Sequence, residues 1–273
     1  MTNENDVNSS RKIRELIVHR ALKCGESCHI GGSLSMVDIL AVLFGRVINY
    51  SAAAPKDEDR DIFILSKGHC VLGYYATMNY FGLMADDVFE TFQQDGSHLI
   101  AHPVKNLDLG IESSNGSLGQ GLSYGTGVAL GMKLRGQKQR RVYVVLGDGE
   151  CNEGSVWETA ATAAEFKVNN ITAILDINGR RNDGLNATYS TVEKFKNIWS
   201  AFGWNVISVD GHDHAAIMDA LSEAKAEEGL PTVILAATVK GKGISFMENN
   251  NDWHHNRITE KTYASIQKEW AAQ

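Results

Sequence analysis

The sequence predicts an α/β fold built on a mostly parallel sheet with helices on both faces. Five short runs are apolar almost throughout, as expected of strands that are covered on both sides. These predicted strands span residues 61–65, 142–146, 171–177, 206–209 and 232–238. Segments with helical spacing of apolar residues fall between them, at 119–134, 153–166, 191–202 and 215–227. Strands that alternate with helices indicate βαβ units and parallel pairing.

Two more helices are predicted ahead of the first strand. Apolar residues recur with helical spacing over residues 11–24. Further on, Ser35 and Asp38 form a capping-box-like pattern before the largely apolar run 39–47. Such a pattern predicts the start of a helix.

Composition limits the class of protein. The 273 residues are 43% hydrophobic and 22% charged, which is ordinary for a soluble globular protein. Without a repeat or low-complexity tract, residues 1–273 are interpreted as one domain, with the polar residues 1–10 as a disordered tail. The net charge of −7 offers no basic field for nucleic acid or an anionic membrane. Neither a secretion signal nor a run of about 18 apolar residues is found, so we expect a cytoplasmic protein with no membrane span.

The four cysteines are scattered, at positions 24, 28, 70 and 151. They are too sparse for a disulfide scaffold, so we expect reduced thiols. Cys24, Cys28 and His29 could form one corner of a metal site, but no second Cys/His pair with ligand spacing accompanies them. Buried thiols on the flank of a helix are the favoured interpretation.

Polar, glycine-containing segments follow every predicted strand. Ligands of parallel sheets bind beyond the carboxyl ends of the strands, so these segments predict a binding site. They are 66–69, 147–149, 178–180, 210–212 and 240–243. In an acidic chain an anionic ligand would be held by local devices: a helix N-terminus, a metal ion or a few histidines.

The segment 142–150, VYVVLGDGE, places Asp148 between two glycines directly after a buried strand. Glycines there allow backbone N–H groups to approach a ligand, and the next helix N-terminus favours an anion. A carboxylate repels a phosphate, so Asp148 is explained only if a divalent cation bridges the two. The segment lacks the last glycine of a dinucleotide-binding loop and the Gly-Lys-Ser/Thr of a P-loop.

Asn178 stands thirty positions after Asp148, at the end of the next predicted strand. One βαβ crossover fits that gap and would set both side chains on neighbouring strand tips. With a backbone carbonyl, phosphate oxygens and water, their oxygens would form an octahedral shell suited to Mg²⁺. Gly-Asp-Gly followed at this distance by Asn resembles the thiamine diphosphate-binding motif. The resemblance implies that Asp148, Asn178 and the carbonyl of Arg180 hold Mg²⁺, or Ca²⁺ or Mn²⁺, on the cofactor's diphosphate.

Further segments resemble transketolases in particular, and together they cover nearly the whole chain. They are 29–36, 38–40, 61–69, 101–103, 116–121, 147–154, 240–248 and 253–254. The resemblance implies a PP-type domain, the one that binds the diphosphate of thiamine diphosphate. It also implies transfer of a two-carbon ketol unit from a ketose, such as a ketose phosphate, to an aldose acceptor.

The same resemblance implies roles for individual residues. His29 and His102 are expected to contact substrate hydroxyls and transfer protons, because neutral imidazoles do both near neutral pH. His69 and His254 are expected nearer the diphosphate and C2 of the cofactor, with His254 also catalytic. Glu153 corresponds to a glutamate of the family's interfacial carboxylate network. The other expected cofactor contacts are Gly116, Leu118, Gly147 and Gly149.

Two features depart from the family's pattern. Arg180, Arg181 and Asn182 place strong positive charge beside the metal loop. Either the guanidinium groups point to solvent or a partner carboxylate, which we favour, or they help to bind an unusual anionic substrate. His255 stands where a glycine is expected, which leaves the local backbone path and the donor open.

In thiamine diphosphate enzymes, a glutamate on a separate pyrimidine-binding domain activates the cofactor. This sequence ends at Gln273, soon after the diphosphate-binding segments. The resemblance therefore implies a second chain with the pyrimidine-binding and C-terminal domains, in an α₂β₂ assembly. Trp157, Trp199 and Trp204 could serve that interface or the core.

Two alternatives to a transketolase subunit remain open. One is a related acyloin- or acetyl-transferring enzyme that uses the same cofactor with a different donor. The departures at 180–182 and His255 keep it open. The other is a non-catalytic subunit with a degenerate site, against which the intact Asp148, Asn178 and histidines argue.

Overall fold

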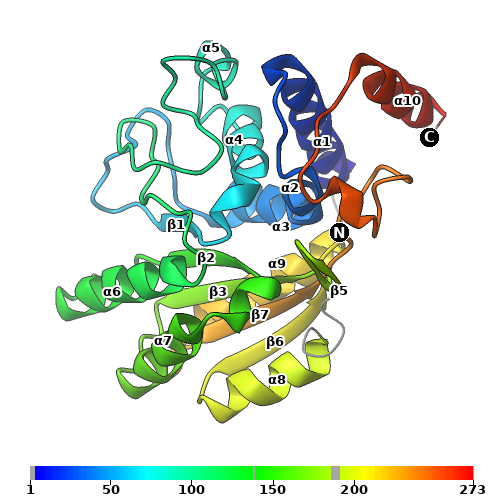
Figure 1. Cartoon of the computed structure of the whole chain (residues 1–273). Helices are drawn as coiled ribbons and strands as arrows, with labels where there is room; N and C mark the ends of the chain where they lie inside the picture. The colour runs from blue at the N-terminus through cyan, green and yellow to red at the C-terminus, as the bar shows by residue number, and fades with distance from the viewer. Residues whose placement is uncertain (1–3, 138, 186–190, 273) are drawn as a thin grey trace.

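A computed structural model describes residues 4–137, 139–185 and 191–272 of the chain. Its centre is a five-stranded sheet in the order β1-β2-β3-β7-β6, in which every neighbouring pair is parallel (Figure 1). The strands are β1 (Ile62–Leu65), β2 (Val142–Gly147), β3 (Ile171–Ile177), β6 (Asn205–Asp210) and β7 (Thr232–Ala237). A two-stranded hairpin, β4 (Arg180–Arg181) and β5 (Gly184–Leu185), follows β3. The predicted parallel α/β class is confirmed.

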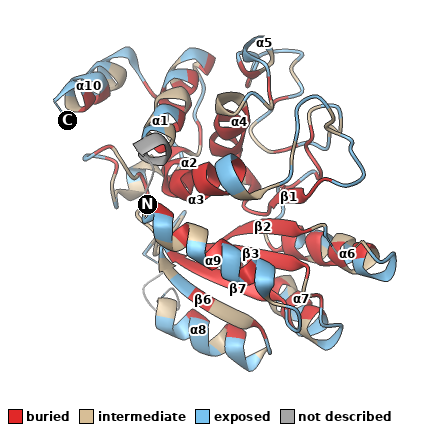
Figure 2. Ribbon diagram, turned by 180° about the vertical axis from the view of Figure 1, so that it is seen from behind, coloured by how far each residue is buried: buried red, intermediate tan, exposed pale blue. Residues whose placement is uncertain are grey.

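Helices cover both faces of this sheet (Figures 1 and 2). One face is covered by α6 (Gln120–Leu134), α7 (Gly154–Glu165) and α8 (Val192–Ala201). The opposite layer contains α1 (Glu4–Cys24), α2 (Ile30–Ser35), α3 (Val37–Val42), α4 (Val71–Tyr80), α9 (His214–Ala226) and α10 (Glu260–Ala271). A short helix, α5 (Asp86–Phe89), packs beside α4.

Each strand divides its side chains between two hydrophobic cores. In β2, Tyr143 and Val145 belong to the core under α1–α4 and α9, whereas Val142, Val144 and Leu146 belong to the core under α6–α8. This division follows the two-residue period of a strand. Because both faces are buried, the strand is apolar at every position, which is why the sequence shows a continuous run without alternation.

The register of the sheet brings distant segments to one edge. Gly147 of β2 pairs with Asp176 of β3, and Asp176 pairs in turn with Ala236 of β7. Although β7 is the last strand in the sequence, it lies between β3 and β6. The carboxyl ends of β1, β2, β3 and β7 therefore open on a common region.

The second predicted helix differs from the expectation. The segment is helical from Ile30, and it divides into α2, α3 and a π-helical turn, η1 (Leu43–Val47). The Ser35 side chain does not cap a helix: it donates to Gly32 O and, at 2.6 Å, to Asp176 Oδ2. The capping-box prediction was therefore wrong, because a buried acid competes for this hydroxyl.

The disordered tail predicted for residues 1–10 is also wrong where the structure describes it. Helix α1 begins at Glu4, and residues 1–3 lie outside the described residues. Ser10 is buried, and its Oγ lies 3.0 Å from Nε2 of His214. Among the helices in the described ranges, none is long and apolar enough to cross a membrane.

Candidate active site

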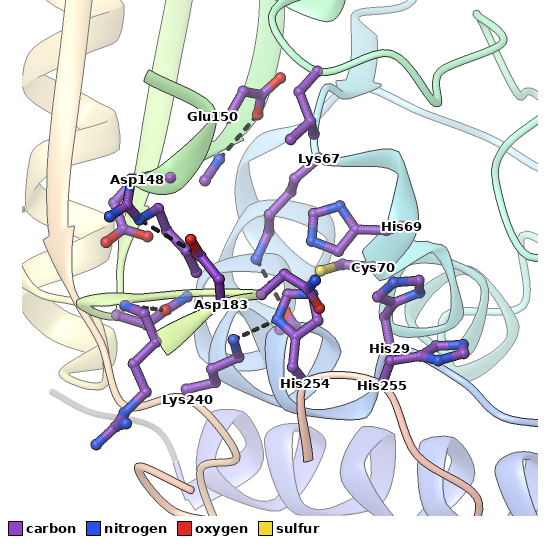
Figure 3. Close-up of a pocket in the computed structure, with 18 of the residues that line it drawn as sticks. His29, Lys67, His69, Cys70, Asp148, Glu150, Asp183, Lys240, His254 and His255 are labelled. Atoms are coloured by element: carbon purple, nitrogen blue, oxygen red, sulfur yellow. Dashed lines mark hydrogen bonds and ion pairs between the residues drawn. The ribbon is translucent and has the colours of Figure 1, made fainter. Parts of the chain in front are cut away.

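A cavity of about 500 Å³ opens at the carboxyl ends of β1, β2, β3 and β7 (Figure 3). Four of the five predicted strand-tip segments contribute to its wall, as do the predicted loop residues Gly116 and Leu118. Its lining includes His29, Lys67, His69, His102, Gly147, Asp148, Gly149, Glu150, Asn178, Arg180, Arg181, Asp183, Lys240, His254 and His255. The sequence therefore located this cavity correctly.

The fifth segment, 210–212, lies elsewhere. His212 Nδ1 is 2.7 Å from Asp38 Oδ2, and Arg14 also pairs with this buried carboxylate. Burial alone would raise the pKa of Asp38, but hydrogen bonds from His212 and His214 and the charge of Arg14 lower it. These residues line a separate cavity of about 580 Å³. The segment follows the edge strand β6, which is separated from β3 by β7.

Asp148 and Asn178 lie on adjacent strand tips that are joined by a hydrogen bond. Asp148 is buried, and its Oδ2 accepts from the backbone N–H of Gly179 at 3.0 Å. Oδ1 of Asn178 accepts from the N–H of Arg180 at 3.2 Å, while its Nδ2 donates to Asp176 at 3.0 Å. The amide of Asn178 is therefore fixed in orientation, with its oxygen toward the backbone of Arg180.

The residue that orients Asn178 was not predicted from the sequence. Asp176 is fully buried and accepts hydrogen bonds from Lys67, Thr238, Ser35 and Asn178. Burial alone would raise its pKa, but the charge of Lys67 lowers it. Burial likewise opposes a charged Lys67, yet the Asp176 carboxylate raises the lysine pKa. The charged forms of both residues are thus favoured, and Lys67 lines the cavity while Asp176 lies beneath the surface.

A second buried acid, Glu150, organises the Gly-Asp-Gly turn. One of its carboxylate oxygens accepts from Ser66 Oγ and from Gly119 N at 2.8 Å, and the other from Gly147 N at 3.1 Å. Burial raises its pKa. Because it ties the end of β1, the loop before α6 and the Asp148 turn together, Glu150 positions three walls of the cavity.

All four predicted histidines line the cavity, and His255 joins them. Figure 3 shows His29, His69, His254 and His255. His29 is central: its ring centroid lies 5.0 Å from that of His69, 6.1 Å from His102, 5.4 Å from His254 and 4.5 Å from His255. The departure at position 255 therefore adds an imidazole beside the predicted substrate histidine.

Burial favours the neutral form of the four predicted histidines. It lowers the pKa of His69 to about 2 and that of His29 to about 3, with neighbouring positive groups adding to the effect. The pKa of His254 falls to about 4 from burial and the charge of Lys240. Burial also lowers the pKa of His102. Neutral rings can accept or donate a hydrogen bond at pH 7.

Lys240 also lines the cavity, although the sequence analysis assigned it no individual role. Its Nζ lies 2.5 Å from Nδ1 of His254, and burial lowers its pKa to about 8. A lysine donates this hydrogen bond, so His254 carries its proton on Nε2. A lysine in a glycine-containing segment that follows a strand is the signal that would have drawn attention to it.

Glu153, the predicted interfacial glutamate, does not line the cavity. It is exposed and stands immediately before α7. Its side chain lies beside Gly119, where an added Cβ would come within 2.8 Å of Glu153 Cβ. Within this chain Glu153 therefore faces outward, and a catalytic role would need a partner.

Arg180 and Arg181 line the cavity and remain half-exposed. The stem of Arg181 packs over Gly149, where an added Cβ would lie 2.9 Å from Arg181 Cγ. Its Nε is 3.8 Å from Asp183 Oδ1. Gly149 is thus required for the close approach of the hairpin to the Gly-Asp-Gly turn.

The tryptophans are divided between core and surface. Trp199 and Trp204 are buried in the core under α6–α8. Trp157 is half-buried, stacks on Phe202 and lines a depression of about 420 Å³ next to the Asp148 turn.

The residues present fit a diphosphate held through a divalent cation. Asp148, Asn178 and the Arg180 backbone would supply a carboxylate, an amide oxygen and a carbonyl, which are the hard donors that Mg²⁺ takes. Among the described residues, no group of three or more His, Cys, Asp and Glu is placed to hold a metal. The four cysteines are free and buried, as predicted.

A parallel sheet whose tips unite Gly-Asp-Gly with a following Asn, beside neutral histidines, defines a thiamine diphosphate-binding α/β protein. The family described as "Transketolase, thiamine diphosphate binding domain" matches residues 5–273. The chain belongs to this family, and it is a transketolase-type transferase subunit that uses thiamine diphosphate.

Among curated relatives, an apulose-4-phosphate transketolase subunit from Actinobacillus succinogenes is 39% identical, over 90% of this chain and 88% of its own. The 6-deoxy-6-sulfo-D-fructose transketolase subunit SqwG from a Clostridium species is 35% identical, over 95% of each chain. Both relatives are named as transketolase subunits.

Solved structures agree with the fold. Transketolase from Leishmania mexicana superimposes with a TM-score of 0.88 at 28% identity, over 97% of this chain. Transketolase from Campylobacter jejuni gives a TM-score of 0.87 at 26% identity. This chain spans 41% and 43% of those two proteins.

Proposed function

We propose that this chain and a partner chain together transfer a two-carbon ketol unit from a ketose phosphate donor to an aldose acceptor. The hydrogen bond from Gly179 to Asp148 carries the proposal, because it makes the Gly-Asp-Gly turn and the Asn178 loop one structure. The neutral histidine cluster lines the same cavity. The comparisons favour this function over acyloin transfer or a non-catalytic role.

In this proposal Asp148, Asn178 and the Arg180 carbonyl hold Mg²⁺, which neutralises the diphosphate. Asp176 supports the arrangement by holding the Asn178 amide in place. Loop residues Gly116 and Leu118, with Gly147 and Gly149 of the turn, would contact the cofactor. The bound thiazolium ring supplies the electron sink for cleavage of the ketose C2–C3 bond.

The four histidines have two kinds of role in this proposal, substrate contact and cofactor contact. His29 and His102 bind substrate hydroxyls and move protons, since both pKa values are lowered and the rings are neutral at pH 7. His69 faces the diphosphate, and His254 lies near the reacting carbon with its Nδ1 fixed by Lys240. The lowered pKa values of His29, His69, His102 and His254 favour neutral rings at the reaction site.

We further propose an α₂β₂ assembly in which the second chain carries the pyrimidine-binding and C-terminal domains. Exposed Glu153 beside Gly119 supports a carboxylate contact with that chain. The names of two relatives contain a sugar phosphate and a sulfonated sugar, so a ketose with a terminal anionic group is the substrate class we infer.

Calorimetry of thiamine diphosphate binding to the two-chain complex tests the metal assignment. Asp148→Ala should weaken Mg²⁺-dependent binding by more than about 100-fold, since changes even to the residues that orient metal ligands cost 10–100-fold. Asp183→Asn is the matched control, because Asp183 lines the same cavity and is not proposed as a ligand. Equal affinity of the Asp148→Ala complex and the unaltered complex would refute the assignment.

Aldose release tests the reaction. The two purified chains with cofactor, Mg²⁺ and a ketose phosphate should release aldose, and this chain alone should release none. Turnover by the isolated chain would contradict the two-chain proposal.

A further inference from the structure

Two buried thiols outside the cavity lie in direct contact. Sγ of Cys24 is 3.6 Å from Sγ of Cys28, and the side chains are only 8% and 3% exposed. Cys24 is the last residue of α1, and Cys28 immediately precedes His29. A disulfide bond is about 2.05 Å long, so the sulfurs need to approach by roughly 1.5 Å to form one.

The surroundings of the pair favour a thiolate on Cys24. The hydrogen bond from the Cys28 thiol lowers the pKa of Cys24, and the same contact raises the pKa of Cys28. Gln93 Nε2 donates to Cys28 Sγ at 3.2 Å and opposes this rise in the pKa of Cys28, but the contact with Cys24 is the larger effect. One thiol is thus poised as nucleophile and the other as proton donor.

An unusual arginine accompanies the pair. Arg20 is only 6% exposed, and its Nε has no hydrogen-bond partner within the described part of the chain. A buried guanidinium normally has an anionic partner. The charge of Arg20 lowers the pKa of both thiols, so a thiolate on Cys24 would provide the missing counter-charge.

We propose that Cys24 and Cys28 form a redox-active dithiol that a peroxide converts into an intramolecular disulfide. The Cys24 thiolate attacks the peroxide, the O–O bond breaks, and a sulfenic acid and hydroxide form. Cys28 sulfur then attacks Cys24 sulfur, the S–O bond breaks, and the leaving hydroxide takes the Cys28 proton as water. The two thiols lose two electrons, and hydrogen peroxide is reduced to two waters.

Closure of this disulfide would act on the cavity through the backbone. Cys28 and Asn256 exchange two backbone hydrogen bonds, of 2.9 and 3.0 Å. These bonds join the residue before His29 to the residue after His255. A shift of Cys28 toward α1 therefore displaces the central histidine or breaks this bridge, and oxidation should lower turnover. This effect rests on the proposed function, whereas disulfide formation does not.

Mass spectrometry of the folded, peroxide-treated chain tests the disulfide without any activity assay. Trypsin cleavage after Lys23 and Arg46 leaves both cysteines in one peptide, 24–46. We expect this peptide to lose the mass of two hydrogen atoms and to resist alkylation until a dithiol reductant is added. Cys28→Ser should abolish the change, and Cys151→Ser, which removes a distant buried thiol, should retain it. Two alkylatable thiols, or separate sulfinic acids, in the unaltered protein would overturn the proposal.

Arg20 variants test the counter-charge. Arg20→Met should slow disulfide formation roughly tenfold at neutral pH, because less thiolate is present, and Arg20→Lys should restore much of the rate. An equal rate in Arg20→Met that remains folded by circular dichroism would contradict the role of Arg20.

Activity of the two-chain complex tests the consequence separately. Oxidised complex should lose about tenfold or more in turnover, since small displacements of catalytic groups have effects of this size or larger. The loss should reverse with reductant and be absent from the Cys28→Ser complex. A disulfide without loss of turnover would overturn the link to His29, and an inactive reduced complex would instead count against the proposed function.

Discussion

Nζ of Lys240 lies 2.5 Å from Nδ1 of His254, within the wall of the histidine-lined cavity. The lysine follows β7, whereas the histidine lies beyond the short helix Asn251–Trp253. A positive charge at this distance disfavours the imidazolium form. The contact therefore fixes both the tautomer and the neutral state of His254.

Replacing this lysine should raise the pKa of His254. Burial is the largest cause of the low value of about 4, and the charge of Lys240 is the next. Lys240→Met should move the pKa partway toward the ordinary value of about 6.5. NMR titration of the imidazole protons would measure the shift, with the His254 signal assigned from His254→Gln. Lys242→Met changes a neighbouring lysine outside the cavity and should leave the pKa of His254 unchanged. An unchanged His254 pKa in Lys240→Met would contradict the prediction.

Stability should fall as the pH falls below about 6.5. His69 is the most strongly affected histidine, because burial lowers its folded-state pKa to about 2. Between that value and the unfolded value of about 6.5, the unfolded chain binds the extra proton. The free energy of unfolding should therefore decrease by up to about 1.4 kcal/mol per pH unit from His69 alone. Urea denaturation from pH 7.5 to 5 would measure the slope, and His69→Gln should make it shallower. An unchanged slope in this variant would contradict the assignment.

The buried ion pair of Lys67 and Asp176 should be costly to break. Lys67→Met leaves Asp176 as an uncompensated charge in the core, and we expect a loss of about 3–5 kcal/mol in the free energy of unfolding. The exposed pair of Lys56 and Asp108 provides the control. Lys56→Met should change stability by at most about 1 kcal/mol. Chemical denaturation of both variants gives the comparison, and similar losses in the two would argue against a charged pair in the core.

Two glycines of α6 should respond in opposite ways to alanine. A Cβ on Gly125 would lie 2.6 Å from Cγ2 of Val144, so Gly125→Ala should destabilise the chain by about 1–3 kcal/mol. Gly127 is exposed, and nothing lies within 4 Å of an added Cβ. Gly127→Ala should stabilise by up to about 1 kcal/mol, because alanine is the better helix former. Thermal unfolding of the two variants tests the packing of α6 on β2. A stabilising effect of Gly125→Ala would contradict this packing.

The apolar runs predicted all five strands of the main sheet to within one residue at each end. Four of them, β1, β2, β3 and β7, are almost fully buried, which explains their continuous apolar runs, whereas only Ile207 of the edge strand β6 is buried. Helix α4 was missed because eight of its ten residues are buried, which removes the polar stripe that reveals an amphipathic helix. Helix α10 was also missed, although its sequence contains signals that predict a helix. Thr259 caps it, and Ile266 and Trp270 are spaced to face the core.

Within the cavity, the sequence located the residues that a resemblance or a strand tip could mark. It did not locate the buried residues that hold those side chains in position. Asp176 lies inside an apolar strand, where a lone acid is itself a signal of a buried partner. That the partner is Lys67 could not be foreseen, because the pairing depends on how β1 and β3 lie on either side of β2. Glu153 is exposed, and in our proposal its carboxylate contacts the partner chain.

The position of β7 has a consequence for biosynthesis. A nascent polypeptide that has not reached residue 232 has no strand to place between β3 and β6, so it exposes hydrogen-bonding groups along their edges. Lys240 and His254 are translated later still. Cofactor binding therefore has to wait until residue 254 has been synthesised, and shorter products would expose the unpaired edges of β3 and β6 without forming the cavity.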